Sequence, residues 1–218
     1  MESPTINSST TSAQYEIQKP LMREPLISET SIQTPSRAIY IGRFQPFSKA
    51  HLEIVQYIAR HDYVDEIIVG IGSSQFDYRN SSILGGPLEN PFTFEERKEM
   101  IERSVTLEGI VKKVIVMGIQ DLFNIELWTA SVLEQASPFR YYFNNKQEES
   151  KLFELAGIEI VPIHVPVDKN LKAGNIRRKM IAGDQEYRQY LPTGTITVLD
   201  RINACERMKG LKEESVAI

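Results

Sequence analysis

Short apolar runs alternate repeatedly with longer amphipathic segments in this chain. The apolar runs are AIYIG at 38–42, EIIVGIG at 66–72, KVIVMG at 113–118, RYYF at 140–143 and IEIVPIHV at 158–165. The helix-like segments that follow them span 51–60, 93–105, 126–136, 147–156 and 175–182. Alternating strands and helices with buried apolar strands are typical of a parallel sheet covered on both faces. The pattern predicts an α/β fold, a Rossmann-like doubly wound parallel sheet that binds ligands beyond the carboxyl ends of its strands.

The ends of the chain differ from this alternating region. Residues 1–36 contain many Ser and Thr residues and no sustained periodicity, so we expect a mobile tail, or else an arm that becomes ordered in an oligomer. We expect the folded domain over 37–212, with a last helix at 194–209 and a short C-terminal tail at 213–218. The segment 75–91 is predicted to be a long loop, either functional or a plain surface insertion.

Charge and cysteine content limit the classes of partner. The net charge is -4, which argues against a broad surface for nucleic acid, although a local cluster of Arg with a helix N-terminus can still bind phosphate. Cys205 is the only cysteine, which excludes an internal disulfide or a Cys-based zinc site and suits a cytoplasmic location. No run approaches the ~18 apolar residues of a membrane span, so we expect no membrane partner.

The stretch GRFQPFSKAH connects the first strand to the first helix. Gly42 allows a sharp turn, and a helix that begins near Lys49 points its first free N–H groups into the crevice above the sheet, which makes an anion site. His51 would face the same anion, and Arg43 and Gln45 can reach the crevice. The alternative is an ordinary loop with an exposed arginine and a surface histidine.

These residues resemble a known signature. GRFQPFSKAH is similar to the GRFQPFHxGH motif of the HxGH nucleotidyltransferase superfamily, and within it to the archaeal-type nicotinamide mononucleotide (NMN) adenylyltransferases. Further motifs follow in the family's order and spacing, namely IGSSQ at 71, NPFTFEERKEMI at 90, ELW at 126, NN at 144 and NIRRKMIAGD at 175. The resemblance covers about residues 37–210. It implies transfer of AMP from ATP to NMN, giving NAD and pyrophosphate, with Mg²⁺ carried by the phosphates and water.

Such a reaction needs positioned cations rather than a protein nucleophile, because the acceptor already carries a nucleophilic phosphate oxygen. By resemblance, His51 would hydrogen-bond the α-phosphate in the transition state and Arg177 would grip the triphosphate. The residues that the resemblance places around the nucleotide are Gly42, Arg43, Phe44, Gln45, Asn144, Asn145 and Asn175. The two asparagines at 144–145 could instead simply make a turn.

The acceptor side is also carried over from the family. Trp128 matches an aromatic residue that stacks on the nicotinamide ring, although a core tryptophan is the alternative. Asn90, Phe92 and Thr93 match the acceptor-side segment, with Phe92 as a core residue and Thr93 as a helix cap as the alternatives. Arg97 is a further candidate, which could otherwise lie on a solvated helix face.

Two positions depart from the family's motifs. Ser48 replaces the first histidine and Ala50 the glycine of the HxGH motif, while Lys172, Ala173 and Gly174 replace an SxT segment. Ser48 is short and uncharged and could serve only as a helix N-cap. Lys172 adds a cation, so either the site is compensated or it has decayed.

Three functions remain open from the sequence. The first is the NMN adenylyltransferase. The second is a related nucleotidyltransferase with another acceptor, such as a nicotinate, flavin or pantetheine phosphate. The third is a catalytically silent nucleotide-binding protein, which the two departures favour. The family resemblance also suggests a homo-oligomer.

Overall fold

The computed structural model describes residues 34–80, 85–165 and 172–216. These residues form a sheet of five parallel strands in the order β3-β2-β1-β4-β5. The strands are β1 (Arg37–Gly42), β2 (Glu66–Ile71), β3 (Lys113–Gly118), β4 (Tyr141–Phe143) and β5 (Glu159–Val161). The strand order reverses at β1, whose neighbours β2 and β4 continue the sheet in opposite directions. The predicted doubly wound α/β fold is therefore confirmed.

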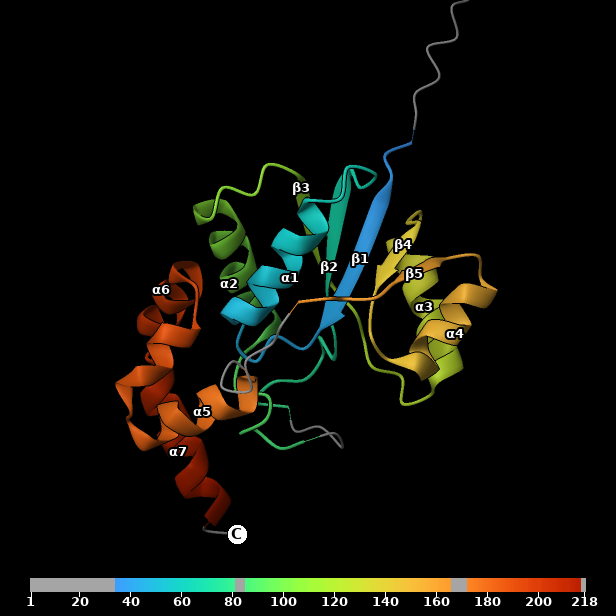
Figure 1. Ribbon diagram of the computed structural model, residues 1–218. Coiled ribbons are helices and arrows are strands. Elements are labelled where there is room, and N and C mark those ends of the chain that lie inside the picture. The colour runs from blue at the N-terminus through green and yellow to red at the C-terminus, as the bar shows by residue number, and fades with distance from the viewer. Residues whose placement is uncertain (1–33, 81–84, 166–171, 217–218) are drawn as a thin grey trace, which may run out of the picture. The chain divides into compact units, whose positions relative to one another are not determined.

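Helices cover both faces of the sheet (Figure 1). Helices α1 (Lys49–Ala59) and α2 (Phe94–Leu107) lie on one face, and α3 (Ile125–Ala136) and α4 (Gln147–Leu155) lie on the other. The remaining helical elements are α5 (Ala173–Ala182), the 3₁₀ segment η2 (Gln185–Tyr190), α6 (Thr193–Arg201) and α7 (Ala204–Val216). They lie on the same face of the sheet as α1 and α2, since their buried residues and those of α1 and α2 form one apolar cluster.

Alternating side chains along the strands divide the core into two clusters. In β1, Ala38 and Tyr40 pack with the α1 and α2 cluster, while Ile39 packs with the cluster beneath α3 and α4. Side chains of successive strand residues point to opposite faces, and both faces are covered here. This explains why the strands read as nearly continuous apolar runs rather than as alternating ones.

The predicted final helix is divided into two. Helix α6 ends at Arg201, and Asn203 has a left-handed φ of 50° before α7 begins. Asparagine adopts this conformation more readily than most residues, so one periodic segment becomes two helices. Helix α7 then continues to Val216 and covers most of the segment 213–218, while residues 1–33 of the predicted N-terminal tail lie outside the described residues.

Helix α6 lies against α2 with almost no space between the two backbones. A Cβ atom placed on Gly194 would lie 2.3 Å from the backbone nitrogen of Ser104. The next residue, Thr195, is fully buried and donates its hydroxyl to the Phe47 carbonyl oxygen at 2.9 Å. The glycine therefore lets α6 reach the loop that leads into α1.

Replacing this glycine tests the close approach of the two helices. Gly194→Ala should lower the free energy of unfolding by roughly 1–3 kcal/mol, because the added methyl group meets backbone that can only move away. Gly210→Ala is the matched control, since a Cβ there meets nothing within 4 Å and alanine favours a helix by about 1 kcal/mol over glycine. Urea denaturation of both variants measures the difference; equal stabilities would contradict the packing.

Candidate active site

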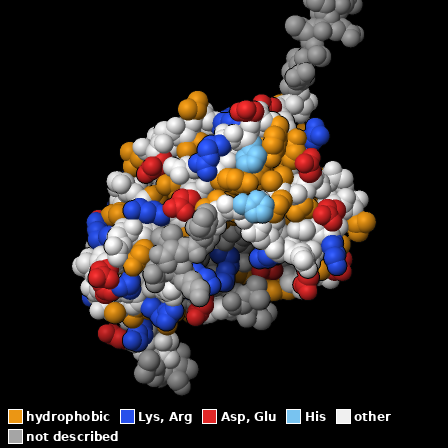
Figure 2. Space-filling model, in the orientation of Figure 1, with side chains coloured by type: hydrophobic (Ala, Val, Ile, Leu, Met, Phe, Trp, Pro, Cys, Tyr) orange, Lys and Arg blue, Asp and Glu red, His pale blue; other side chains and the backbone are white. Residues whose placement is uncertain are grey.

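A cavity of about 480 Å³ opens at the carboxyl ends of the central strands. It lies where the strand order reverses, the usual ligand site of such sheets. Among the residues predicted for the site, Gly42, Arg43 and Trp128 line it. The other lining residues are Ile41, Gly72, Ser73, Asp121, Phe123, Asn124, Ile125, Lys146 and Glu149. Figure 2 shows Lys and Arg side chains at the bottom of a hollow in the molecular face.

The turn after β1 is shaped by one glycine and one aromatic ring. A Cβ atom on Gly42 would lie 2.8 Å from the ring of Phe44, so only glycine fits. Phe44 has a φ of 51° and is buried, a strained conformation for a bulky residue. Its ring packs edge-on against Tyr40, Phe47 and His51. Phe44 therefore supports the turn from below and does not line the cavity.

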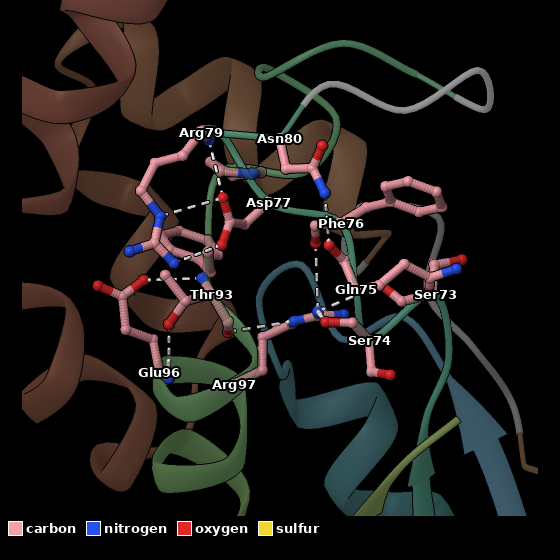
Figure 3. Close-up of polar contacts among 12 residues, drawn as sticks. Ser73, Ser74, Gln75, Phe76, Asp77, Arg79, Asn80, Thr93, Glu96 and Arg97 are labelled. Atoms are coloured by element: carbon pink, nitrogen blue, oxygen red, sulfur yellow. Dashed lines mark hydrogen bonds and ion pairs between the residues drawn. The ribbon is translucent and has the colours of Figure 1, made fainter. Parts of the chain in front are cut away.

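Arg97 is completely buried and joins the loops that follow β1 and β2. Its guanidinium donates to the carbonyl oxygens of Arg43 and Gly72, both at 3.1 Å, and at 3.3–3.4 Å to those of Ser73, Ser74 and Phe76. Figure 3 shows it pointing from α2 toward the 73–76 loop. Burial lowers the pKa of Arg97 to about 10, so the group stays charged at neutral pH. The solvated helix face considered for Arg97 is wrong.

Two further arginines lie at the turn after β1, and of the two only Arg43 lines the cavity. Arg43 is exposed, lines the cavity and donates no side-chain hydrogen bond to any described residue. Arg177, on α5, donates to the Gln45 carbonyl oxygen at 2.8 Å. Burial chiefly lowers the pKa of Arg177, Glu89 opposes this shift, and the charge of Arg43 adds to it. Two cations close enough to disfavour each other, one of them unpaired, are suited to bind an anion.

Ser48 occupies the N-cap of α1 and holds His51. The Ser48 backbone N–H donates to Nδ1 of His51 at 2.9 Å, and the Ser48 hydroxyl lies 3.1 Å from the same nitrogen. Because Nδ1 accepts, the proton of the neutral ring is on Nε2. The ring of Phe47 stacks on the imidazole at 5.7 Å, and burial lowers the pKa of His51 to about 4. His51 is therefore a neutral donor at physiological pH.

Gln45 joins the turn to the segment before α2 and does not reach into the crevice. Its side-chain amide donates to the Phe92 carbonyl oxygen at 3.1 Å and accepts from the Phe92 N–H at 3.0 Å. The Phe92 side chain is fully buried in the core, as one of the two alternatives had it. Gln45 and Phe92 thus hold the turn after β1 against the segment that precedes α2.

The other residues of the acceptor-side segment make local contacts. Thr93 is the N-cap of α2. Its hydroxyl accepts a hydrogen bond from the Glu96 N–H at 3.1 Å, and its own N–H donates to the Glu96 carboxylate at 3.0 Å. These two bonds confirm the predicted capping box. Asn90 is buried and donates to the carbonyl oxygens of Gly85 and Gly86 at 3.4 and 3.5 Å.

Asn144 and Asn145 lie away from the main cavity, in a hollow beside β5. The Asn145 amide pairs with the backbone of Ile163 in both directions, at 3.0 and 2.8 Å, and Asn144 donates to the Lys146 carbonyl oxygen at 3.3 Å. They extend the pairing of β4 with β5 and form a turn, which agrees with the alternative kept open for them.

The start of α5 carries the second departure from the family's motifs. Lys172 is the exposed N-cap of α5, and its own side chain does not cap the helix. Asn175 accepts a hydrogen bond from Arg178 in the first turn. The Arg177 side chain thus reaches the turn after β1, whereas Arg178 is exposed and Ile176 is buried in the core.

Trp128 both packs and lines the cavity. It is half-buried on α3, and its ring meets Phe153 of α4 edge-on at 6.0 Å. The rest of the ring borders the cavity. The two roles considered for Trp128 are therefore compatible.

The sequence reasoning missed several lining residues at the end of β3. Asp121 accepts from the Ser73 hydroxyl at 3.1 Å and from the Phe123 N–H at 3.0 Å. The amide of Gln75 pairs with the backbone of Asp121 at 2.8 and 3.1 Å. Phe123 has a φ of 53° and is 51% exposed beside the cavity. Their position in the loop that follows an apolar strand, at the carboxyl end of the predicted sheet, was the signal that could have identified them.

The buried imidazole predicts a pH dependence of stability. An unfolded chain takes up a proton on His51 near pH 6.5, whereas the native protein does so only near 4. Stability should therefore fall as the pH drops from about 6.5 to about 4, by up to about 3 kcal/mol, and this contribution should be constant below that range. His51→Gln should give a flatter profile in urea denaturation over this range, because the titrating group is gone.

His164→Gln, which changes an exposed histidine, is the matched control and should keep the wild-type slope. Equal slopes for His51→Gln and the wild type would show that the imidazole is not held neutral.

Comparisons with known proteins agree with this geometry. The model of the cytidylyltransferase-like family matches residues 39–179. A nicotinamide-nucleotide adenylyltransferase from Archaeoglobus fulgidus is 32% identical over 80% of this chain and 97% of its own length. One from Pyrococcus abyssi is 30% identical over 80% of this chain and 88% of its own. Among solved structures, a bifunctional NMN adenylyltransferase/ADP ribose pyrophosphatase from Francisella tularensis shares the fold, with a TM-score of 0.66 at 23% identity, over 84% of this chain and 54% of that one.

Proposed function

The chain belongs to the cytidylyltransferase-like family, among its nicotinamide-nucleotide adenylyltransferases, and on that premise we propose that it transfers AMP from ATP to NMN. A phosphate oxygen of NMN attacks the α-phosphorus of ATP, the bond from that phosphorus to the bridging oxygen breaks, and pyrophosphate leaves as NAD forms. The observation that carries the proposal is the cavity at the reversal of strand order, with an unpaired Arg43 on its wall and Arg177 behind the same turn.

The residues act by positioning and by charge. Arg43 and Arg177 would neutralise the phosphates, and the first N–H groups of α1 add the positive end of the helix dipole. His51 would donate from Nε2 to an α-phosphate oxygen without titrating, since its Nδ1 is held by the Ser48 N–H. A phosphoryl transfer needs no more from the protein than in-line geometry and electrostatic stabilisation.

Mg²⁺ would enter with the ATP. Within the described residues there is no group of three or more His, Cys, Asp or Glu side chains that could hold a metal ion. Mg²⁺ usually keeps several waters and binds mainly to substrate phosphates, so it does not need a cluster of protein ligands. A Mg²⁺ ion bound by the ATP phosphates would add to the neutralisation of the transferring group.

The other expectations about partners and location stay predictions. None of the described helices is long and apolar enough to cross a membrane. A cytoplasmic location and a homo-oligomer follow from the single cysteine and from the family resemblance, respectively. Light scattering at several protein concentrations measures the oligomeric state directly.

The proposed reaction is tested by product formation. The purified protein, incubated with Mg-ATP and NMN, should release pyrophosphate and form NAD in equal amounts, measured by a coupled assay and by mass. His51→Ala should lower kcat by roughly 10²-fold, by analogy with the loss of one oxyanion donor, with little change in ATP affinity. Flavin and pantetheine phosphates serve as alternative acceptors; turnover with one of these alone would replace the proposal, and no turnover with any acceptor would favour a silent nucleotide-binding protein.

Trp128 should contribute to acceptor binding. Trp128→Ala should raise the KM for NMN by on the order of 10- to 100-fold, because stacking on an aromatic side chain contributes roughly 1–3 kcal/mol per base in comparable sites, while ATP affinity stays nearly unchanged. Leu133→Ala is the matched control, since Leu133 packs on the same cluster from the same helix and does not line the cavity. If both variants lose stability and the affinities for NMN and ATP fall equally, Trp128 is only a core residue.

A further inference from the structure

The proposed function does not explain Glu149, a carboxylate held in place on the cavity wall. Glu149 lies in the first turn of α4 and lines the cavity with Trp128. Its Oε2 accepts from the hydroxyl of Tyr142 at 3.0 Å, and its Oε1 accepts from Lys146 at 2.6 Å. The Glu149 side chain is only 18% exposed, whereas that of Lys146 is 74% exposed. The carboxylate is thus fixed from the buried side, and its ammonium partner lies toward water.

A continuous chain of contacts connects this carboxylate to the predicted stacking residue. The ring of Trp128 meets that of Phe153 at 6.0 Å, and Phe153 meets Tyr142 at 4.6 Å. Tyr142 is buried in β4, and its hydroxyl holds Glu149. The wall that would carry the pyridine ring therefore holds a fixed carboxylate, whose exposed ion-pair partner Lys146 also lines the cavity.

A carboxylate at this place would distinguish two closely related acceptors. The pyridine ring of NMN carries a neutral carboxamide, whose NH₂ group can donate to a carboxylate oxygen. Each oxygen of Glu149 accepts one hydrogen bond in the structure and has a further lone pair. The nicotinate analogue carries a second carboxylate there, which would meet a like charge that cannot move away.

We propose that Glu149 is a specificity-determining residue that selects an acceptor with a neutral carboxamide over one with a carboxylate. The inference rests on the proposed adenylyltransferase function and adds to it which pyridine nucleotide the cavity accepts. Asp121 also lines the cavity, and each of its oxygens accepts one hydrogen bond, as those of Glu149 do. Among the described residues, however, no chain of ring contacts like that through Phe153 and Tyr142 connects Asp121 to Trp128.

The test compares kcat/KM for NMN and for nicotinate mononucleotide under identical conditions. Glu149→Gln keeps the shape and the acceptor oxygen and removes the charge. It should lower kcat/KM for NMN, because a hydrogen bond to a neutral amide is weaker than one to a carboxylate, and raise kcat/KM for nicotinate mononucleotide, so that the preference for NMN falls by about tenfold or more. Tyr142→Phe should shift the preference in the same direction, because the carboxylate is no longer held in place.

Glu148→Gln is the matched control, since Glu148 lies in the same first turn of α4 and is exposed away from the cavity. It should keep the wild-type preference, and melting curves show whether each variant is folded. An unchanged preference in folded Glu149→Gln or in folded Tyr142→Phe overturns the proposal. Absence of turnover with both nucleotides in the wild type would instead reject the proposed function, which keeps the two failures distinguishable.

Discussion

The site depends on one buried guanidinium that has only backbone oxygens as hydrogen-bond partners. Arg97 donates to carbonyl oxygens that follow β1 and β2, and to that of Thr93 at the start of its own helix. A buried cation that loses its partners is strongly destabilised, so neither loop can move without the other. The two strand ends and α2 therefore behave as one rigid part. Because the Arg43 carbonyl oxygen is bound inside, its side chain is left to point outward along the cavity wall.

The neutral state of His51 determines where positive charge comes from. A protonated imidazole would have to give up the hydrogen bond that Nδ1 accepts from the Ser48 N–H, and burial already lowers its pKa to about 4. The histidine can therefore orient a phosphate oxygen by donation, but it adds no net charge. In the proposed reaction, neutralisation of the phosphates would fall to Arg43, Arg177, the N-terminus of α1 and the cation that ATP brings. This division suits phosphoryl transfer, in which charge is spread over several oxygens at once.

The sequence predicted the fold well because the alternation of apolar runs with amphipathic segments extends over most of the chain. All five strands and the first five helices fall where the apolar runs place them. The site was harder to predict, because chemical type does not say which way a side chain points. Gln45 and Arg97 were expected to contact the ligand, yet their polar groups form hydrogen bonds with backbone atoms and do not line the cavity. Conversely, Asp121 and Trp128 follow β3 and Glu149 follows β4. They line one cavity only because the two strands end at the same edge of the parallel sheet, with β2 and β1 between them, a relation that no local motif contains.

The two departures from the family's motifs lie in well-ordered surroundings, and whether they leave the site compensated or decayed stays a question for the activity assay. Ser48 is fully buried at the N-cap of α1, and its hydroxyl contacts His51 within the turn. Buried polar groups without a partner are costly. Among the described residues, the buried side-chain atoms without a partner are Ser36 Oγ and Thr129 Oγ1, and neither belongs to this turn. Serine thus removes one imidazole while keeping the remaining one in place. Lys172 adds an exposed ammonium at the start of the helix that carries Arg177, and its compensation for the missing imidazole stays a prediction.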